Sequence, residues 1–176
     1  MHLQDSIVSL NTRKFGDVGE ILMTKIIKGL EKSDDLSYDK KLDNQKVEIK
    51  FSRALKKSPP LTEENIYEVL SSDNVSRLIS DSDKTVDKWD CNIQQVKVKC
   101  FDILYYGVFF KECIYIFSIK PNQIMEDTNI NFSDKQHRGN VGEGQFHLND
   151  KKIEYHIDNY LLKKMTYEEF ECTIKA

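Results

Sequence analysis

Hydrophobic positions at helical spacing mark the first element of the chain. Apolar side chains recur every three or four residues from Phe15 to Leu30 and predict a helix over that range, ended by the polar run Ser33-Asp34-Asp35. Residues 36–42 and 46–52 have the composition of two short strands. The Asp43-Asn44 pair between them tolerates a left-handed backbone and suits a two-residue turn. The pattern therefore predicts a helix followed by a β-hairpin.

The rest of the chain alternates between turn residues and strand-forming side chains. Thr62-Glu-Glu-Asn opens a helix to about residue 70, continued over 74–80, and Thr166-Tyr-Glu-Glu169 is a capping box that starts a last helix. Residues 93–98, 103–110 and 114–119 are predicted strands, 120–144 a long polar loop, and 145–148 with 152–156 a second hairpin around Asn149-Asp150. This order predicts an α/β (α+β) fold in which helices flank a mixed β-sheet.

Size and composition favour one folded domain. The 176 residues are 39% hydrophobic and 10% aromatic, enough for a single substantial core. A net charge of −3 excludes a polycation that coats nucleic acid, although a local basic face is compatible with it. The first 14 residues have no apolar run of signal-peptide length, and Lys111 and Glu112 interrupt the most apolar segment, so we expect a cytoplasmic protein without a membrane span.

The predicted hairpin gathers two carboxylates and an amine on one face. If Asp43 and Asn44 form the turn, Leu42 pairs with Gln45, and Asp39 then lies opposite Glu48. Lys50 shares that face because side chains alternate along a strand, while the residues between them face the core. Two carboxylates roughly 5 Å apart at Cβ repel each other unless a cation lies between them.

A divalent cation would relieve that repulsion. Mg²⁺ accepts one or two carboxylates together with waters and a phosphate oxygen, and a nearby lysine can hold the attacking water. The pattern therefore indicates a site for phosphodiester hydrolysis, with solvated charge pairs on an exposed strand as the alternative. Asp43 is the alternative to Asp39 as the first metal ligand. A side chain in a turn, however, more often forms hydrogen bonds with the nearby backbone, so Asp39 is preferred.

Other polar segments are candidates for contact with DNA. Arg53, Lys56 and Lys57 follow the hairpin, where a DNA backbone needs cations. Gln94, Gln95 and Lys97 either solvate a strand end or line the site. The GNVGEG segment lacks the GK[ST] of a P-loop, so its glycines either shape a tight loop or belong to a DNA-reading loop. That loop would use side chains of the types that contact base edges: His137, Arg138, Asn140 and Gln145.

The hairpin also resembles a known family. Asp39 and, nine positions on, Glu48-Ile-Lys50 resemble the D-x(n)-E-x-K signature of the PD-(D/E)xK nuclease superfamily, with Ser37-Tyr38 in place of its proline. Glu20 in FGDVGEILMTKII matches the helical glutamate that often joins that family's site. The segments IQQVKVKCFDILYYGVFF and HRGNVGEGQFHLND are similar to parts of small type II restriction endonucleases.

The resemblance carries expectations about fold and function. It implies a restriction-endonuclease-like core over about residues 15–120 of a single nuclease domain, with a DNA-contacting loop and a C-terminal hairpin and helix over about 121–176. Asp39 and Glu48 would bind Mg²⁺, Lys50 would position the water, and Glu20 would support the metal.

The implied activity is cleavage of double-stranded DNA at a short specific sequence by a type II restriction endonuclease. The active form would be a homodimer, and a cognate DNA methyltransferase would be encoded nearby. The alternatives are a repair or junction-resolving nuclease of the same fold and a non-catalytic nucleic-acid-binding module.

Overall fold

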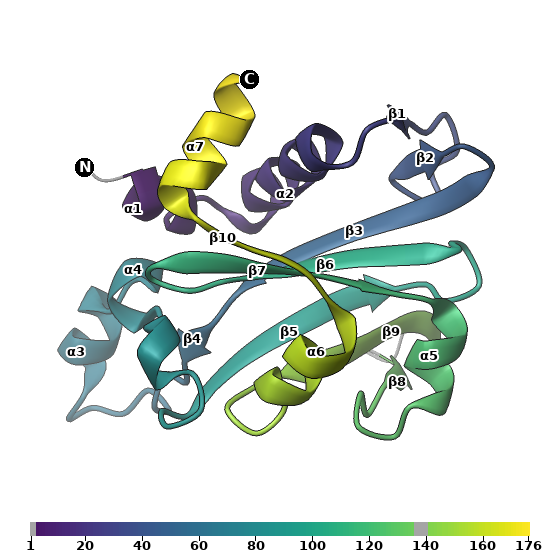
Figure 1. Cartoon of the computed structure of the whole chain (residues 1–176). Coiled ribbons are helices and arrows are strands. Elements are labelled where there is room, and N and C mark those ends of the chain that lie inside the picture. Colours follow the sequence, from purple (N-terminus) through teal and green to yellow (C-terminus); the bar gives the residue numbers. More distant parts are fainter. Residues whose placement is uncertain (1–2, 136–140) are drawn as a thin grey trace.

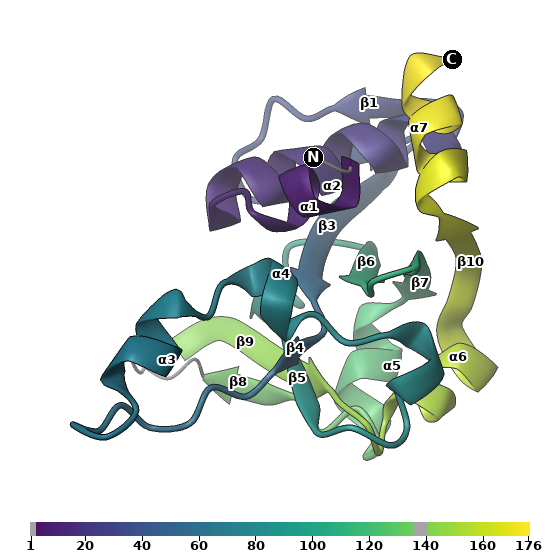
Figure 2. The same ribbon diagram turned by 90° about the vertical axis from the view of Figure 1, so that its left-hand side faces the viewer.

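Two β-sheets packed against each other form the centre of the molecule. The computed structural model describes residues 3–135 and 141–176 (Figure 1). The larger sheet has six strands in the order β1-β2-β3-β6-β7-β10, and the smaller has four in the order β4-β5-β9-β8. Helices α1, α2 and α7 cover one face of the larger sheet, and the smaller sheet lies on its other face together with α6 (Figures 1 and 2).

The elements follow one another along the chain in an order that mixes helices and strands. They are α1 (Leu3–Val8), α2 (Thr12–Ile26), β1 (Leu30–Lys32), β2 (Lys40–Leu42), β3 (Gln45–Arg53), β4 (Leu55–Lys56), α3 (Ile66–Ser71), α4 (Asn74–Arg77), the 3₁₀ helix η1 (Asp81–Asp83), β5 (Trp89–Val96), β6 (Ile103–Phe109), β7 (Cys113–Ile119), α5 (Pro121–Glu126), β8 (Ser133–Lys135), β9 (Val141–Leu148), α6 (Ile153–Tyr160), β10 (Leu161–Thr166) and α7 (Tyr167–Lys175).

The hydrophobic core divides into two clusters, one on each face of the larger sheet. Phe15 and Leu22 of α2 pack with Val47 and Ile49 of β3 in the first cluster. The second cluster lies between the two sheets and contains residues such as Trp89, Tyr106, Phe117 and Phe146. The larger sheet is therefore buried on both faces, which explains its runs of apolar residues in β6 and β7.

Strand β3 connects the two sheets and is only partly paired along one edge. It runs parallel to β6 from Val47 to Arg53 and antiparallel to β2 only from Gln45 to Val47. After Ala54 the chain enters β4, which pairs with β5 in the smaller sheet. Among the described residues, the edge of β3 beyond Val47 on the β2 side carries no further strand, so it borders a groove rather than the sheet interior.

The coarse fold prediction is confirmed: a mixed sheet is flanked by helices. The strands predicted over 103–110 and 114–119 are β6 and β7, and the capping box at Thr166 starts α7 through the Thr166 and Glu169 side chains. The first helix, predicted from Phe15 to Leu30, lies a few residues earlier in the chain. It begins at Thr12, capped by Asn11, and ends at Ile26, because Gly29 takes a left-handed φ of 82° and Leu30 joins the sheet opposite Leu42.

Three predictions about local structure are wrong. The second hairpin does not form, because Ile153 and His156 are buried at a helical spacing of three and belong to α6. The loop predicted over 120–144 contains α5, which starts at Pro121 and buries Ile124, and also β8 and the beginning of β9. The strand predicted over 36–42 is confined to Lys40–Leu42.

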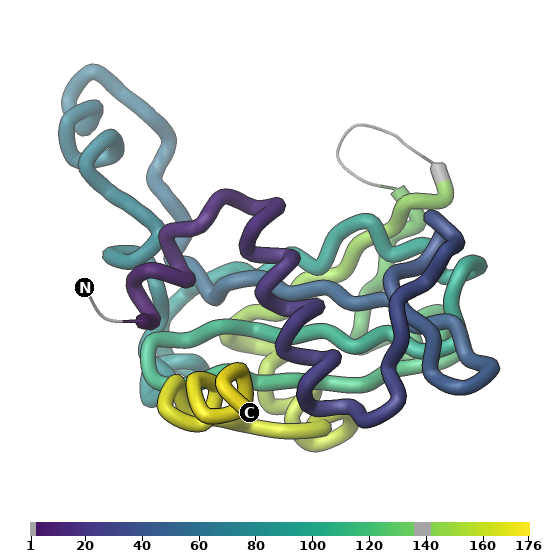
Figure 3. Tube along the Cα trace, turned by 90° about the horizontal axis from the view of Figure 1, so that it is seen from above, coloured from purple at the N-terminus to yellow at the C-terminus, as the bar shows by residue number. Residues whose placement is uncertain are grey.

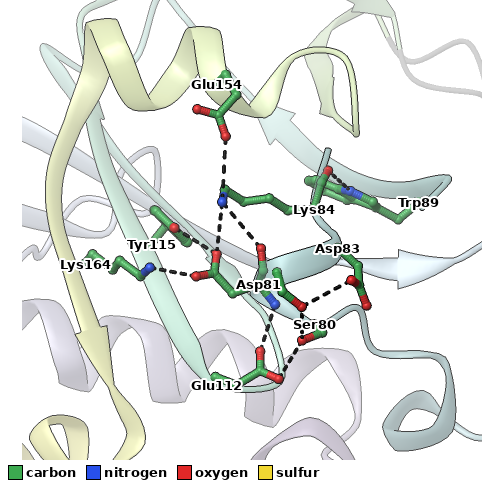
Figure 4. Close-up of polar contacts among 10 residues, drawn as sticks. Ser80, Asp81, Asp83, Lys84, Trp89, Glu112, Tyr115, Glu154 and Lys164 are labelled. Atoms are coloured by element: carbon green, nitrogen blue, oxygen red, sulfur yellow. Dashed lines mark hydrogen bonds and ion pairs between the residues drawn. The ribbon is translucent and has the colours of Figure 1, made fainter. Parts of the chain in front are cut away.

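A polar network holds the segment before β5 against the larger sheet (Figure 4). The Asp81 carboxylate accepts hydrogen bonds from the Tyr115 hydroxyl at 2.8 Å and from Lys164 Nζ at 2.7 Å. The Glu112 carboxylate in turn accepts from the backbone N–H of Asp81 at 2.7 Å. These contacts link η1 to β7, to the β6–β7 turn and to β10.

The segment around α3 projects from the body of the molecule (Figure 3). Helix α3 buries none of its side chains, and Tyr67 and Leu70 are largely exposed. No helix in the described part of the chain is both long and apolar enough to cross a membrane.

Candidate active site

The β2–β3 hairpin has the register that the sequence predicts. Leu42 pairs with Gln45, Lys41 with Lys46, and Lys40 with Val47. Asp39 precedes β2, and its backbone N–H donates to the carbonyl of Val47 at 3.1 Å, which keeps Asp39 in line with the hairpin. Asp43 has a φ of 52° in the turn.

Asp39, Glu48 and Lys50 form one cluster. Lys50 Nζ lies 2.5 Å from Glu48 Oε1 and 3.6 Å from Asp39 Oδ2. Asp39 Oδ2 also accepts a hydrogen bond of 2.8 Å from the backbone N–H of Ile49 at the open edge of β3. The three predicted residues therefore meet, and the lysine ammonium partly neutralises both carboxylates.

Burial and the attraction between opposite charges act against each other in this cluster. The Glu48 side chain is 7% exposed, and its burial raises the pKa of the carboxyl against the opposing attraction of Lys50. Burial alone would lower the pKa of Lys50, but the nearby charges of Glu48 and Asp39 outweigh it and raise the pKa instead. Lys50 is therefore an ammonium at neutral pH.

The donor set of the cluster fits a hard cation that keeps most of its waters. Glu48 Oε2 is buried and has no hydrogen-bond partner, so one carboxylate oxygen is left for a further ligand. Among the described residues no group of three or more His, Cys, Asp or Glu side chains is arranged to hold a metal. A pair of carboxylates is nevertheless the protein contribution that Mg²⁺ commonly takes, with water and phosphate oxygens as its other ligands.

Glu20 lies near this cluster but has a different partner. Its carboxylate, on α2, is 3.3 Å from Lys40 Nζ, and in the described chain no ion pair joins it to Lys50. The structure nevertheless brings Glu20 to the same groove as Lys50.

The groove runs along the open edge of β3. Its volume is about 660 Å³, with α2 on one side and β5 on the other. Arg13 and Glu20 line it from α2, Lys50 and Arg53 from β3, and Gln95 from β5. Lys50 is therefore the residue of the cluster that lines the groove, whereas Asp39 and Glu48 lie behind it and are not among the described lining residues.

The other predicted DNA contacts lie in several places. Arg53 is 9% exposed, donates from Nη2 to the carbonyl of Leu10 at 2.6 Å, and lies with Cζ 3.7 Å from the ring centre of Phe15. Lys56 on β4 pairs with Asp87 at 2.8 Å, and Lys57 is exposed. Of these three cations, Arg53 alone lines the groove, where burial lowers its pKa to about 10 and leaves it charged at neutral pH.

The predicted DNA-reading loop is only partly described. His137, Arg138 and Asn140 lie outside the described residues. Gln145 is on β9, is 7% exposed, and accepts a hydrogen bond of 2.9 Å from Asn92 Nδ2. Gln145 therefore holds a neighbouring side chain in place and is itself largely covered.

Sequence reasoning did not single out Asn92, which lines the groove, and left the roles of Gln94 and Gln95 open. The signal that places Gln94 and Gln95 there is a β-bulge, which shifts the register of β5 against β9 between Gln94 and Val96. A bulge of this kind is not visible in a pattern of apolar and polar residues.

Comparisons with known proteins give no independent assignment: no family model matches the chain, and neither curated proteins nor solved structures show a match.

Proposed function

We propose that this protein is a Mg²⁺-dependent endonuclease that hydrolyses phosphodiester bonds in double-stranded DNA at a short specific sequence, as type II restriction endonucleases do. The observation that carries the proposal is the cluster of Asp39, Glu48 and Lys50 at the open edge of β3. Two carboxylates joined to an amine that lines the groove supply the groups that metal-assisted hydrolysis needs.

Each residue has a role that its surroundings support. Asp39 and Glu48 would hold the metal, Asp39 through a carboxylate fixed by the Ile49 N–H and Glu48 through its unpartnered Oε2. When bound, Mg²⁺ would stabilise the charge that develops on the phosphate. Lys50 would orient the attacking water as an ammonium donor. Glu20 would bond metal-bound waters from α2, on the same wall of the groove as Lys50.

Charge in the groove supports binding of a nucleic-acid strand. Arg13 is exposed and lines the same depression as Lys50, so a cation is available for a phosphate that flanks the one being cut, and the buried Arg53 adds a positive charge beneath the groove. The net charge of −3 makes these local cations more important than any general attraction to DNA. We further propose a homodimer as the acting unit, with a cognate DNA methyltransferase encoded nearby to protect the host's own sites.

The decisive experiment is digestion of a mixed DNA substrate by the purified protein with Mg²⁺ or with EDTA. We expect discrete fragments from the wild type with Mg²⁺ and none with EDTA. Glu48→Gln and Lys50→Ala should each reduce the cleavage rate by roughly 100- to 10,000-fold, the range for loss of a group that acts in the chemical step. Thermal unfolding of each variant establishes that it is folded at the assay temperature.

Lys41→Ala is the matched control, because it removes an exposed lysine from the same hairpin. It should cleave at close to the wild-type rate. Cleavage that persists in folded Glu48→Gln and Lys50→Ala proteins would disprove the proposed site. Cleavage confined to branched DNA would replace the restriction activity by the junction-resolving alternative.

A further inference from the structure

The two walls of the groove differ in chemistry. The wall formed by α2 and β3 carries charged side chains, including Arg13, Glu20 and Lys50. The wall formed by β5 carries three uncharged amides: Asn92, Gln94 and Gln95. Cations suit phosphates, whereas amides both donate and accept hydrogen bonds and therefore suit the edges of bases.

A backbone irregularity places two of these amides in the groove together. Strand β5 buries alternate residues as far as Ile93, so a regular strand would also turn Gln95 toward the core. The bulge instead leaves Gln94 and Gln95 both exposed and returns Val96 to the core. The extra residue thus exposes a second amide without disturbing the buried positions on either side.

This arrangement costs backbone strain at Gln95. Its φ is 58°, in the left-handed region that glycine adopts far more readily than a residue with a side chain. Bulges and strained residues of this kind are concentrated next to active sites, where they redirect a side chain. Glycine would adopt this backbone conformation with less strain. The presence of glutamine therefore indicates that its amide has a role of its own.

The amide wall lines the same groove as Lys50, the amine of the cluster. β4 and β5 pair Leu55 with Asp90 and Lys56 with Trp89. Because β4 follows β3 directly, β5 lies alongside this part of the chain, and Gln95 of β5 and Lys50 of β3 line the same groove. A nucleic-acid strand with a phosphate at Lys50 would present its adjacent nucleotides to Gln94 and Gln95.

One amide of the wall is already held in place. Asn92 Nδ2 donates to the buried Gln145, while Asn92 Oδ1 is buried without a hydrogen-bond partner. The wall therefore combines a fixed amide with two exposed ones.

We infer that Gln94 and Gln95 are specificity-determining residues that contact the bases next to the scissile phosphate. The inference rests on the proposed nuclease function and adds the element that reads the sequence. An amide side chain pairs best with adenine, to which it can donate and accept at once. The phosphates of the same strand would face the charged wall.

The test is cleavage of a randomised DNA library with Mg²⁺, followed by sequencing of the cut ends. Gln95→Gly is the informative variant, because glycine adopts the left-handed backbone readily and lacks the side chain that carries the amide. Asn131→Gly is its matched control: Asn131 is an exposed amide with a φ of 53° and does not line the groove. Gln94→Ala tests the second amide, and thermal unfolding is recorded for every variant.

We expect Gln95→Gly to unfold at a temperature at least as high as the wild type and still to cut DNA. At one base position next to the cut, its discrimination should fall roughly 5- to 150-fold, the range for loss of a bidentate base contact. Asn131→Gly should keep the wild-type preference. An unchanged preference in both glutamine variants, or an equal loss of cleavage on all sequences, would overturn the inference while leaving the nuclease intact. A wild type that cuts no DNA would instead overturn the proposed function.

Discussion

At the residue scale, the environment of His156 makes the protein sensitive to acid. The side chain is fully buried on α6, and Nδ1 lies 2.7 Å from the Tyr106 hydroxyl. The ring of Phe146 stacks on the imidazole, and Nε2 has no hydrogen-bond partner. Burial, aided by the charge of Lys152, lowers the pKa of His156 to about 4 from the ordinary value of 6.5.

This shift predicts a loss of stability below neutral pH. Between pH 4 and 6.5 the unfolded chain binds the proton and the folded chain does not, so the contribution is complete above pH 6.5 and is lost as the pH falls. We expect the free energy of unfolding of the wild type to drop by about 2 kcal/mol from pH 7 to pH 5. Urea unfolding at the two pH values measures it.

A substitution assigns the effect to this one imidazole. His156→Gln keeps a polar partner for Tyr106 and removes the titrating ring, so its free energy of unfolding should change much less between the two pH values. His147→Gln, which keeps the buried histidine, should retain the wild-type loss. An equal drop in the wild type and in His156→Gln would assign the acid sensitivity to other groups.

The residues of the candidate site could be predicted where the hairpin alone determines which side chains lie together. A two-residue turn fixes which side chains share a face, so Asp39, Glu48 and Lys50 followed from the turn at Asp43-Asn44. The pKa of Glu48 also depends on the charge of Lys97, which opposes the effect of burial and lies more than forty positions away in the sequence. Local patterning contains no information about such an interaction.

At the element scale, the hairpin turn carries removable strain. Asp43 is exposed and has a φ of 52°, a conformation in which glycine is preferred. We expect Asp43→Gly to stabilise the protein by about 1 kcal/mol, as seen in urea unfolding. Because Asp43 lies outside the Asp39–Glu48–Lys50 cluster, nuclease activity with Mg²⁺ should persist. Loss of activity in a folded Asp43→Gly protein would make Asp43 the metal ligand in place of Asp39.

The contacts of η1 predict a second effect at this scale. Burial of Asp81 is opposed by hydrogen bonds from Lys164 and Tyr115, and the pKa of its carboxyl is lowered as a result (Figure 4). We expect Asp81→Ala to destabilise the protein by about 1–3 kcal/mol in urea unfolding, because Tyr115 and Lys164 both lose their acceptor. Asp83→Ala, in the same turn of 3₁₀ helix, should change stability much less.

Elements were predictable where one periodicity was unambiguous. The apolar runs of β6 and β7 are short and rich in Ile, Tyr and Phe, which favours buried strands, and the capping box at Thr166 located the start of α7. The apolar and polar residues from Lys152 to His156 fit both the strand period and the helix period. The contacts of His156 with Tyr106 and Phe146 belong to a helix. Tertiary packing therefore determined what local preference left open.

At the scale of the whole molecule, the fold class was predictable and the second sheet was not. The chain leaves the larger sheet after β3, at Ala54, and continues as β4 in the smaller sheet. The pattern of apolar and polar residues does not predict this crossing. The crossing brings β5 opposite β3 and so creates the groove. The candidate site is thus a product of the pairing between distant strands as much as of its own three residues.

A whole-molecule consequence follows from the number of clusters in each chain. In its described residues the chain has a single Asp39–Glu48–Lys50 cluster, which would cut one strand at a time. If a homodimer cuts both strands, a dimer with one wild-type and one Lys50→Ala subunit should nick its site without breaking the duplex. Such dimers can be obtained by co-expression with two affinity tags and purification on both, and gel electrophoresis of plasmid DNA separates nicked from linear products.

We expect the mixed dimer to accumulate nicked circles and the wild type to produce linear molecules. Linear product at an undiminished rate from the mixed dimer would show that a single subunit cuts both strands.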